Sequence, residues 1–395
     1  MPRNARVVAA LATDPNHGQG AQVGALLSRF LGVDVAINMA DQRIKEALGL
    51  PQSDRIGPLL GNDLVVARTD QGVLVAWVAK DERQLHQVAA HMTRYRAVTR
   101  GPLLLAGTPA AVQQAIGQRA GMTRRLFEAR LRGLPRDAFV RLEGTGTVPR
   151  LPFPITSYAL TVRADDTGMH ARLRAATQRT NAEDLPLAPG ATPPTPLGRT
   201  NGATAGIRDL RQVIQYALRR LQTTDAGAFR RYEVARRALK LIRRGDINSD
   251  VIDQLSGTAT IWSPDLKTFT ITAPVADPGR MAKALNGLGP LIRRILDAVH
   301  LPGARYGVTG STFIVTTDPA TSLARLAAGR PQRIGNLTGA LTGIIRGQTL
   351  GQALIDRLGL PAIASLSLAT LGDTTFAVRT ATTGVEASAD LTIRK

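Results

Sequence analysis

The 395-residue sequence contains no cysteine, which excludes disulfide bonds, thiolate zinc sites, iron–sulfur clusters and cysteine nucleophiles. Aromatic residues are also scarce, at 4% of the chain. The core must therefore be built from Ala, Leu, Val and Ile, and sites that stack bases or sugars on aromatic rings are disfavoured. No apolar run approaches the roughly 18–20 residues that a membrane-spanning helix needs.

An export signal is missing as well. The N-terminal residues, MPRNARVVAALATDPN, contain neither a secretory hydrophobic region nor a lipobox cysteine. Two alternatives stay open. The protein is cytoplasmic if Met1 is the native start, or it is an extracytoplasmic protein of the cell envelope whose export or anchor segment is missing from this chain.

Acidic residues are few compared with basic ones, 30 against 50, which gives a net charge of +20 and a pI near 11.4. This charge favours anionic partners, namely an anionic membrane, an acidic wall polymer or nucleic acid. The simpler alternative is a solvated arginine-rich surface without a specific partner. A hydrophobic content of 44% is typical of a folded protein, and the length suggests two domains.

Two parts of the chain resemble each other in sequence. YRAVTRGPLLLAGTPAAVQQAIGQ from Tyr95 aligns with YGVTGSTFIVTTDPATSLARLAAG from Tyr306, and LLGNDLVVARTD from Leu59 aligns with LSGTATIWSPD from Leu255. Between the two parts lies a stretch with five prolines, which favours an extended linker. We predict a first α+β repeat over residues 1–180, a Pro-rich linker over 181–202 and a second α+β repeat over 203–395.

The alternation of apolar and polar residues predicts the type of sheet. In VEASADLTI, residues 385–393, the alternation gives one buried and one wet face, as is typical of an antiparallel sheet. KTFTITA, residues 267–273, alternates similarly, and VVARTDQGVLVAWV predicts a hairpin that turns at Asp70-Gln71-Gly72. The predicted fold class is α+β, with two tandem copies of one unit, each a mainly antiparallel sheet packed with helices.

The order ARVVAALATDP, GALLSRFLG, IKEALGL, IGPLLGNDLVVA, VAWVAKDERQL and GPLLLAGTPAAVQQAI resembles an uncharacterised, mainly actinobacterial family known as domain of unknown function three-three-five-two. The resemblance covers most of the first predicted repeat and extends more faintly into the second. It implies an extracytoplasmic protein that a signal or lipid anchor holds at the membrane, with no established activity. It implies no functional residues, and this chain departs from the pattern because it carries no anchor.

A glycine-rich stretch, DPNHGQGAQVG, lies between an apolar run and a predicted helix, which is the layout of a phosphate-binding loop. No Gly-Lys dipeptide occurs in the chain, so a Walker A site is excluded, and the glycine spacing differs from the G-x-G-x-x-G of dinucleotide-binding folds. The second predicted repeat keeps a strand and a helix here without the loop, which favours a simple turn. The weak phosphate-loop candidates are His17, Gly18, Gly20 and Gly24.

The remaining residues contain no pattern typical of a catalytic or metal site. His86 and His91 are five residues apart, about 140° around a helix, rather than four apart on one face. Asp165 and Asp166 are expected in a hairpin turn. We predict no catalytic residue, no metal site and no cofactor. Solvated side chains are expected for the five histidines, His17, His86, His91, His170 and His300.

The most informative stretch is FRRYEVARRALKLIRR, residues 229–244, in which most basic residues share one arc of a helix. The apolar residues expected on the opposite arc are Val234, Ala235, Ala238, Leu239, Leu241 and Ile242. The simpler interpretation is a helix that packs its apolar side on the protein and leaves its arginines in water. The sharper interpretation is an anion-docking face. The anion-binding candidates are Arg219, Arg220, Arg230, Arg236, Arg237, Lys240, Arg243 and Arg244.

These observations lead to three hypotheses. The first is a non-enzymatic cell-envelope binding or scaffold protein that takes a lipid-like ligand, or that docks on anionic lipid or wall polymer through the basic helix. The second is a cytoplasmic nucleic-acid-associated protein that binds phosphates non-specifically, a lesser option because aromatic residues and nucleic-acid-binding motifs are lacking. The third is an enzyme with a phosphate-binding loop at residues 16–24. The sequence leaves a protein partner and the oligomeric state open.

Overall fold

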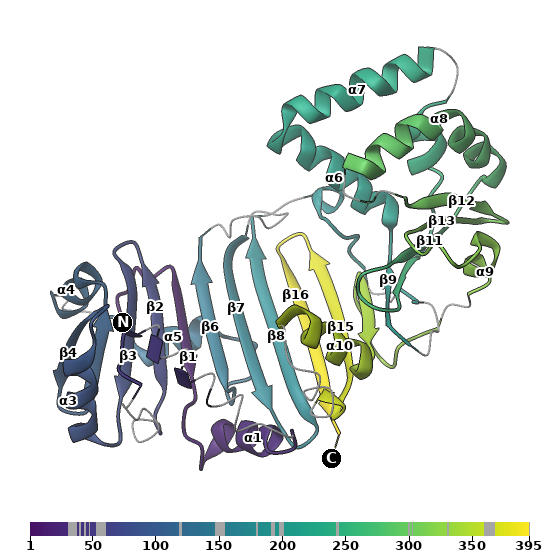
Figure 1. Cartoon of the computed structure of the whole chain (residues 1–395). Coiled ribbons are helices and arrows are strands. Elements are labelled where there is room, and N and C mark those ends of the chain that lie inside the picture. Colours follow the sequence, from purple (N-terminus) through teal and green to yellow (C-terminus); the bar gives the residue numbers. More distant parts are fainter. Residues whose placement is uncertain are drawn as a thin grey trace.

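The structure is a computed structural model (Figure 1), and helices and strands carry the labels of that figure. It describes the chain except for residues 31–37, 39–40, 43–44, 47, 53–60, 118–120, 147–154, 179–180, 191–193, 197–200, 242–244, 299–300, 302, 330–331, 359–367 and 395.

The described strands form one wide sheet of 16 strands. The strands of the N-terminal half are β1 (Val7–Leu11), β2 (Leu64–Thr69), β3 (Gly72–Val78), β4 (Arg96–Arg100), β5 (Leu103–Gly107), β6 (Val140–Thr145), β7 (Ile155–Ala164) and β8 (Gly168–Thr177). Those of the C-terminal half are β9 (Ala203–Ile207), β10 (Ala259–Ser263), β11 (Thr270–Pro274), β12 (Arg305–Thr309), β13 (Thr312–Thr316), β14 (Leu341–Ile345), β15 (Leu371–Ala381) and β16 (Gly384–Ile393).

In space the strands follow the order β12-β13-β11-β10-β9-β14-β15-β16-β8-β7-β6-β1-β2-β3-β5-β4. Each of these neighbouring pairs is antiparallel. The predicted α+β class and antiparallel sheet are therefore confirmed. The halves share one sheet instead of holding one each, because β8 pairs with β16 from Gly168↔Thr392 to Ala176↔Gly384. The two-copy organisation stays a prediction.

Helices flank the sheet, and polar side chains cap several of them. Asp81, Thr123 and Asp209 each accept a hydrogen bond from a backbone N–H in the first turn of the helix that follows. The helices are α1 (Gly18–Leu27), α3 (Glu82–His91), α4 (Pro109–Gly117), α5 (Arg124–Arg130), α6 (Leu210–Thr224), α7 (Ala226–Leu241), α8 (Pro278–Ala298), α9 (Leu323–Ala327) and α10 (Gly347–Leu358), with a 3₁₀ turn η2 (Ala182–Asp184) and a π-helical turn η3 (Asn248–Ile252).

The apolar cores lie between these helices and the sheet. The largest core packs Met281 and Leu288 of α8, together with residues of α6 and η3, against β9–β13. At the other end of the sheet, Leu85 of α3 packs on Trp77 and Leu104, and Phe127 of α5 packs on β1 and β2. The central strands β8, β16 and β15 lie between these cores (Figure 1).

Two local predictions have different outcomes. The hairpin at Asp70-Gln71-Gly72 is confirmed, because Thr69 pairs with Gly72, whose φ of +118° suits glycine. The threonine side of residues 267–273 is buried instead of wet. Thr270 is 1% exposed, and its hydroxyl lies 2.8 Å from that of Thr316 on the neighbouring strand. Cross-strand hydroxyl pairs satisfy these groups, so the alternation alone does not tell which face of this strand is buried.

The described part of the predicted linker packs on the C-terminal half. Leu185 is 2% exposed. The backbone oxygens of Leu187 and Pro194 accept hydrogen bonds from the hydroxyls of Thr380 and Thr342, at 2.9 and 3.0 Å. This segment therefore covers β14 and β15.

Candidate anion-binding sites

Helix α7 is anchored to the protein through one side. Phe229 and Tyr232 lie on that side, with their ring centroids 6.2 Å apart, and Tyr232 packs against the core formed with α6 and α8. The Tyr232 hydroxyl donates to Asn248 Oδ1 at 2.6 Å. Burial raises the pKa of Tyr232 to about 12. These contacts fix the rotation of the helix about its own axis.

Arg236, a predicted anion-binding residue, belongs to the anchored side. Its guanidinium donates to the two carboxylate oxygens of Glu233 at 3.0 and 2.9 Å and to Asp246 Oδ2 at 3.0 Å. The hydrogen bond to Glu233 is the largest cause of the raised pKa of Arg236. Because its side chain is only 22% exposed, Arg236 holds the helix in place and does not face an external anion.

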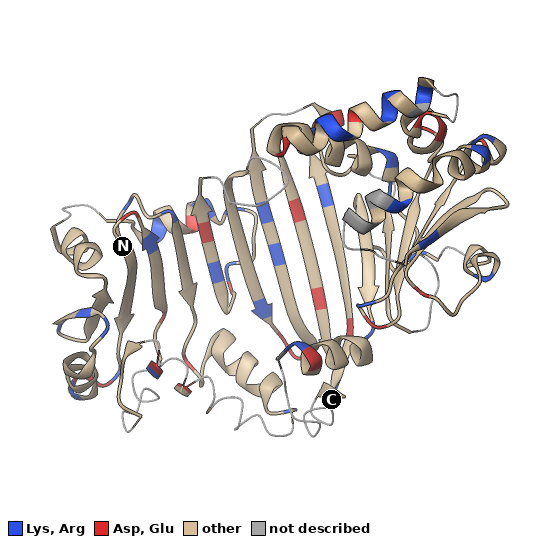
Figure 2. Cartoon of the chain, turned by 45° about the horizontal axis from the view of Figure 1, so that its top comes forward, with Lys and Arg blue, Asp and Glu red and all other residues tan. Residues whose placement is uncertain are grey.

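The solvent side of α7 differs from the prediction. Val234 and Leu241, expected to pack inward, are 63% and 83% exposed. At 100° per residue, anchoring at Tyr232 and Arg236 turns these two side chains outward. Exposed basic residues flank them in the sequence, and Figure 2 shows Lys and Arg positions in blue along the α7 ribbon. The outer face of α7 consists of Arg230, Arg231, Val234, Arg237, Ala238, Lys240 and Leu241, all of which are exposed.

The cations of this face are weakly paired within the protein. Arg237 Nε lies 3.7 Å from Glu233, and Lys240 Nζ lies 3.8 Å from Asp246. Their side chains are 76% and 70% exposed, and such pairs contribute about 0–1 kcal/mol. An external anion can therefore replace these contacts at little cost.

The remaining basic candidates are not part of this face. Arg219 and Arg220 lie on α6 and are partly buried. The Arg219 guanidinium donates to the backbone oxygen of Glu183 and lies 3.6 Å from Asp184, so it fastens η2 to α6. Arg243 and Arg244 lie outside the described residues, as does His300.

The glycine-rich loop serves chain packing. Helix α1 begins at Gly18, directly after His17, and β1 before it pairs with two antiparallel strands, unlike the parallel strands of a dinucleotide-binding fold. Gly20 is required because a Cβ there would lie 1.8 Å from the backbone oxygen of Asp14. The Asp14 carboxylate accepts from Asn16 N–H at 3.0 Å, beside the helix start. A carboxylate at this place repels phosphate, and Gly24 lies inside α1, beyond the first turn that carries the unpaired N–H groups.

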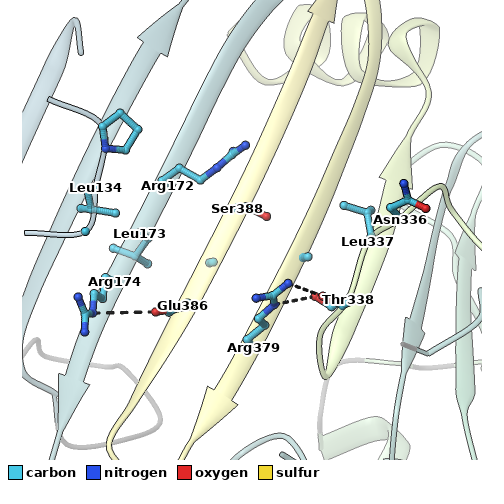
Figure 3. A pocket seen from close by; sticks show the side chains of 14 residues that line it. Leu134, Arg172, Leu173, Arg174, Asn336, Leu337, Thr338, Arg379, Glu386 and Ser388 are labelled. Carbon is cyan, nitrogen blue, oxygen red and sulfur yellow. Dashed lines mark hydrogen bonds and ion pairs between the residues drawn. The ribbon is translucent and has the colours of Figure 1, made fainter. Parts of the chain in front are cut away.

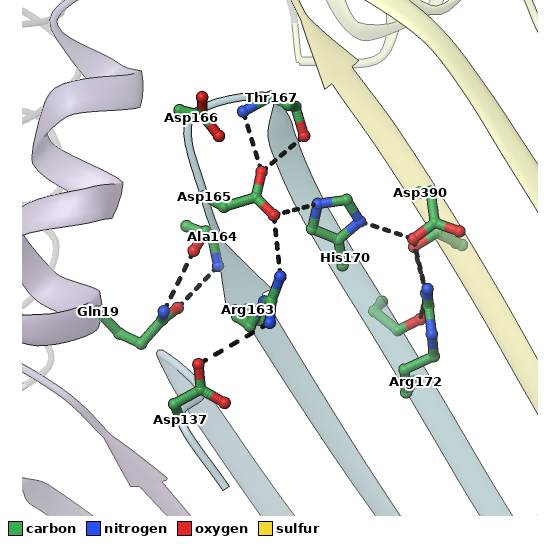
Figure 4. A network of polar contacts seen from close by, with 12 residues as sticks. Gln19, Asp137, Arg163, Ala164, Asp165, Asp166, Thr167, His170, Arg172 and Asp390 are labelled. Atoms are coloured by element: carbon green, nitrogen blue, oxygen red, sulfur yellow. Dashed lines mark hydrogen bonds and ion pairs between the residues drawn. The ribbon is translucent and has the colours of Figure 1, made fainter. Parts of the chain in front are cut away.

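His170 lies in a polar network on the central strands (Figure 4). Its Nδ1 lies 2.7 Å from Asp390 Oδ1, which also contacts Arg172 at 2.7 Å. Its Nε2 lies 3.0 Å from Asp165 Oδ2, at ion-pair distance but without hydrogen-bond geometry. Since the His170 side chain is 24% exposed, the prediction of a simply solvated histidine is wrong here.

The two carboxylates of this network are held in their charged form. Hydrogen bonds from the Thr167 hydroxyl and backbone N–H, then from Arg163, bring the pKa of Asp165 far below its usual range, and the nearby His170 ring acts in the same direction. Asp165 lies in the predicted hairpin turn, between the end of β7 and the start of β8. Burial alone would raise the pKa of Asp390, but hydrogen bonds from Arg172 and His170 outweigh it and lower that pKa.

A second group of charges lies four residues further along the same strands from the His170–Asp390 pair. Antiparallel register places Arg174 of β8, Glu386 of β16 and Arg379 of β15 side by side on one face (Figure 3). Arg174 Nε lies 4.0 Å from Glu386, and one Arg174 N–H donates to the backbone oxygen of Arg132 at 3.2 Å. Arg379 Nε donates to the backbone oxygen of Thr338 at 3.1 Å. We call Arg174, Glu386 and Arg379 the open row.

Small residues create a hollow on each side of the open row. On one side the register places Ser388 and Ala377 next to Arg172, and on the other side it aligns Ala176, Gly384 and Ala381. The resulting cavities measure about 400 and 640 Å³ and share the open row. The loops Gly133–Pro135 and Asn336–Thr338 line the smaller cavity, and Thr338 also lines the larger one. We call these two cavities with the open row the central trough.

Sequence reasoning found the polar face of residues 385–393 in β16 but not the trough, because nothing in the sequence predicts that β8 and β16 pair. Among the described residues, no group of three or more His, Asp or Glu side chains is placed to hold a metal ion. Within those same residues, no helix is both long enough and apolar enough to cross a membrane.

The protein is thus of the α+β class, with one wide antiparallel sheet. Its two candidate anion-binding surfaces are the outer face of α7 and the central trough. No protein-family model matches the sequence, and no curated protein matches it. Two solved structures are similar over part of the chain. "Structure of crystal form III of TP0453" is 7% identical with a TM-score of 0.28, covering 46% of this chain and 79% of that one. "Structure of crystal form I of TP0453" is 9% identical with a TM-score of 0.27, covering 46% and 78%. Scores this low do not support a shared fold or function.

Proposed function

We propose that this protein is a non-enzymatic binding protein that docks on anionic membrane surfaces through the outer face of α7. The observation that carries the proposal is the exposure of Val234 and Leu241 among four cations. A helix that only needed solvation would place polar side chains at these positions. An apolar stripe bordered by Lys and Arg is typical of helices that lie in a lipid interface.

The energies of the two kinds of contact are comparable. Each basic side chain near an anionic bilayer contributes about 1 kcal/mol, so the four cations together supply about 4 kcal/mol at low salt. Burying an exposed Val or Leu side chain contributes about 1.5–3 kcal/mol. Neither contribution alone dominates, and we expect docking to need both charge and apolar insertion.

The position of α7 suits such docking. It lies beyond α6 and α8 at the top of the view in Figure 1, farther from the sheet than either of them. Its inner side is fixed by Tyr232 and Arg236, so the outer face is presented in one orientation. The proposal includes a location at the cell envelope, which the family resemblance also favours.

We also infer that the chain contains two copies of one α+β unit. Support comes from the strand order, which read from one edge to the centre is β4-β5-β3-β2-β1-β6-β7-β8. Read from the other edge it is β12-β13-β11-β10-β9-β14-β15-β16, the same order with eight added to each number. On this interpretation the basic character of α7 is an addition to the second unit, because the sequence of the first unit has no equally basic stretch between its first helix and β2.

Co-sedimentation with phosphatidylglycerol vesicles, at low and near-physiological salt, tests the docking proposal. Replacing Arg230, Arg231, Arg237 and Lys240 by Gln is expected to lower vesicle binding at least tenfold, since about 1.4 kcal/mol corresponds to each factor of ten. The double variant Val234→Ser with Leu241→Ser should also weaken binding at least tenfold while leaving the charge unchanged.

A matched control removes the same charge elsewhere. Arg83, Arg94, Arg96 and Arg100 are exposed near the β4 edge of the sheet, and their replacement by Gln should leave vesicle binding within about twofold of the wild type. Equal loss in the control would mean that binding depends on net charge and not on α7. Stronger binding to duplex DNA than to vesicles would favour the nucleic-acid hypothesis instead.

A further inference from the structure

We propose that the central trough is a second binding site, for a polyol phosphate chain in which phosphate groups alternate with hydroxyl-bearing carbons. The site lies on the face of the sheet that carries Ala377 and Arg379. The neighbouring residue Val378 pairs with Leu341, which packs on the largest core. Because successive residues of a strand point to opposite faces, the trough lies on the face opposite the core that supports α7.

The arginines of the open row fit phosphate groups. Arg174 and Arg379 lie on strands that are two apart in the sheet, so their backbones are separated by about 10 Å. Each of these guanidiniums has five N–H donors, and the bonds to Arg132 and Thr338 use only some of them. With its remaining donors, each arginine can bind two oxygens of one phosphate group. The two arginines together would then bind two phosphates of one chain.

Glu386 between the arginines selects against a simple polyanion. Its carboxylate is 60% exposed, lies 4.0 Å from Arg174 and accepts hydrogen bonds only. A ligand that carries phosphate alone would be repelled there. A ligand with hydroxyl groups between its phosphates can donate to Glu386 and to Ser388 in the adjoining hollow.

The lining of the trough also narrows the ligand class. Among the described residues that line the two cavities there is no aromatic side chain. Nucleic acids are therefore disfavoured, because single strands bind chiefly by stacking bases on aromatic rings. A flexible polyol needs no such platform.

The shape of the trough suits a chain. The cavities of about 400 and 640 Å³ lie one after the other, and each is of the size that holds a small organic ligand. Arg379 and Glu386, which separate them, are exposed, so a ligand can continue from one cavity into the next. This arrangement fits consecutive units of a polymer better than one compact molecule.

Titration calorimetry of the full chain with poly(glycerol phosphate) of defined length tests the proposal. The double variant Arg174→Gln with Arg379→Gln is expected to bind at least tenfold more weakly, since it removes both phosphate contacts. The control Arg83→Gln with Arg100→Gln, which has the same charge loss, should bind within about twofold of the wild type. The fourfold α7 variant should keep its affinity for the polymer, which separates this site from membrane docking.

Glu386→Ala decides the ligand chemistry. We expect it to weaken polymer binding by about threefold, because hydroxyl donors lose their acceptor, and to strengthen the binding of inorganic pyrophosphate. Stronger polymer binding by Glu386→Ala, or unchanged binding by the Arg174 and Arg379 variant, would overturn the proposal. So would tighter binding of alginate, a carboxylated polysaccharide, or of a single-stranded oligonucleotide with the same number of charges.

Discussion

The central strands carry two rows of charged residues. Both rows run across neighbouring antiparallel strands, but their side chains contact one another to different extents. In the closed row, Arg163, His170 and Asp390 lie side by side in register, and His170 also reaches Asp165. In the open row, Arg379, Glu386 and Arg174 lie side by side in the same way. Beside the closed row the Thr167 hydroxyl holds Asp165, and His170 contacts Asp390, whereas the open row has a hollow on each side.

The difference lies in the order of charges. In the closed row the two ring nitrogens of His170 lie 2.7 Å from Asp390 and 3.0 Å from Asp165, so each carboxylate is in close contact with a partner. In the open row the central carboxylate lies 4.0 Å from Arg174, and both arginines turn to loop carbonyls. The same sheet thus uses one row for stability and leaves the other available for a ligand.

The largest effect is expected from breaking the closed row. Asp390→Ala removes the carboxylate that both His170 and Arg172 contact, whose side chains are partly buried, and should lower the free energy of unfolding by about 1–3 kcal/mol. Urea denaturation followed by circular dichroism measures this change. Glu386→Ala in the open row is the matched control, and we expect it to cost less than about 0.5 kcal/mol because its partner is distant and both are exposed. Equal costs in the two rows would contradict the comparison.

A smaller, pH-dependent effect is expected from Asp165→Asn, about 1 kcal/mol at pH 7. The folded pKa of Asp165 is depressed, so its contribution to stability is fully present above the unfolded pKa of about 3.9 and is lost as pH falls through the folded pKa. The wild type and the variant should therefore differ at neutral pH and converge in acid, below about pH 4. Thermal melts over that range measure the convergence. A constant difference at every pH would mean that the charge of Asp165 is not the cause.

These two rows also mark how far sequence reasoning could go. The alternation in residues 385–393 predicted that Glu386, Ser388 and Asp390 share one face, and the structure confirms the antiparallel strand. The polar positions of β8 were equally readable. Their meeting depends on the pairing of β8 with β16, which are more than two hundred residues apart, and no local pattern encodes it.

The helical face of α7 was misjudged for a different reason. The periodicity of apolar residues predicted that Val234 and Leu241 pack inward. Tertiary contacts of Tyr232 and Arg236 instead decide the rotation, because Asn248, Asp246 and the core lie on their side. A basic residue can be the anchored one when its carboxylate partner comes from the segment that follows the helix.

The smallest change in stability is expected from filling a hollow beside the open row. Ser388 lies between Arg172 and Ala377 and is partly exposed, so Ser388→Leu should alter the free energy of unfolding by no more than about 0.5 kcal/mol. The larger side chain should nevertheless occupy the cavity and weaken poly(glycerol phosphate) binding at least about tenfold. Calorimetry and denaturation of the same sample separate the two effects. If Ser388→Leu bound the polymer as the wild type does, the ligand would have to lie outside this cavity, and the open row would lose its distinction from the closed one.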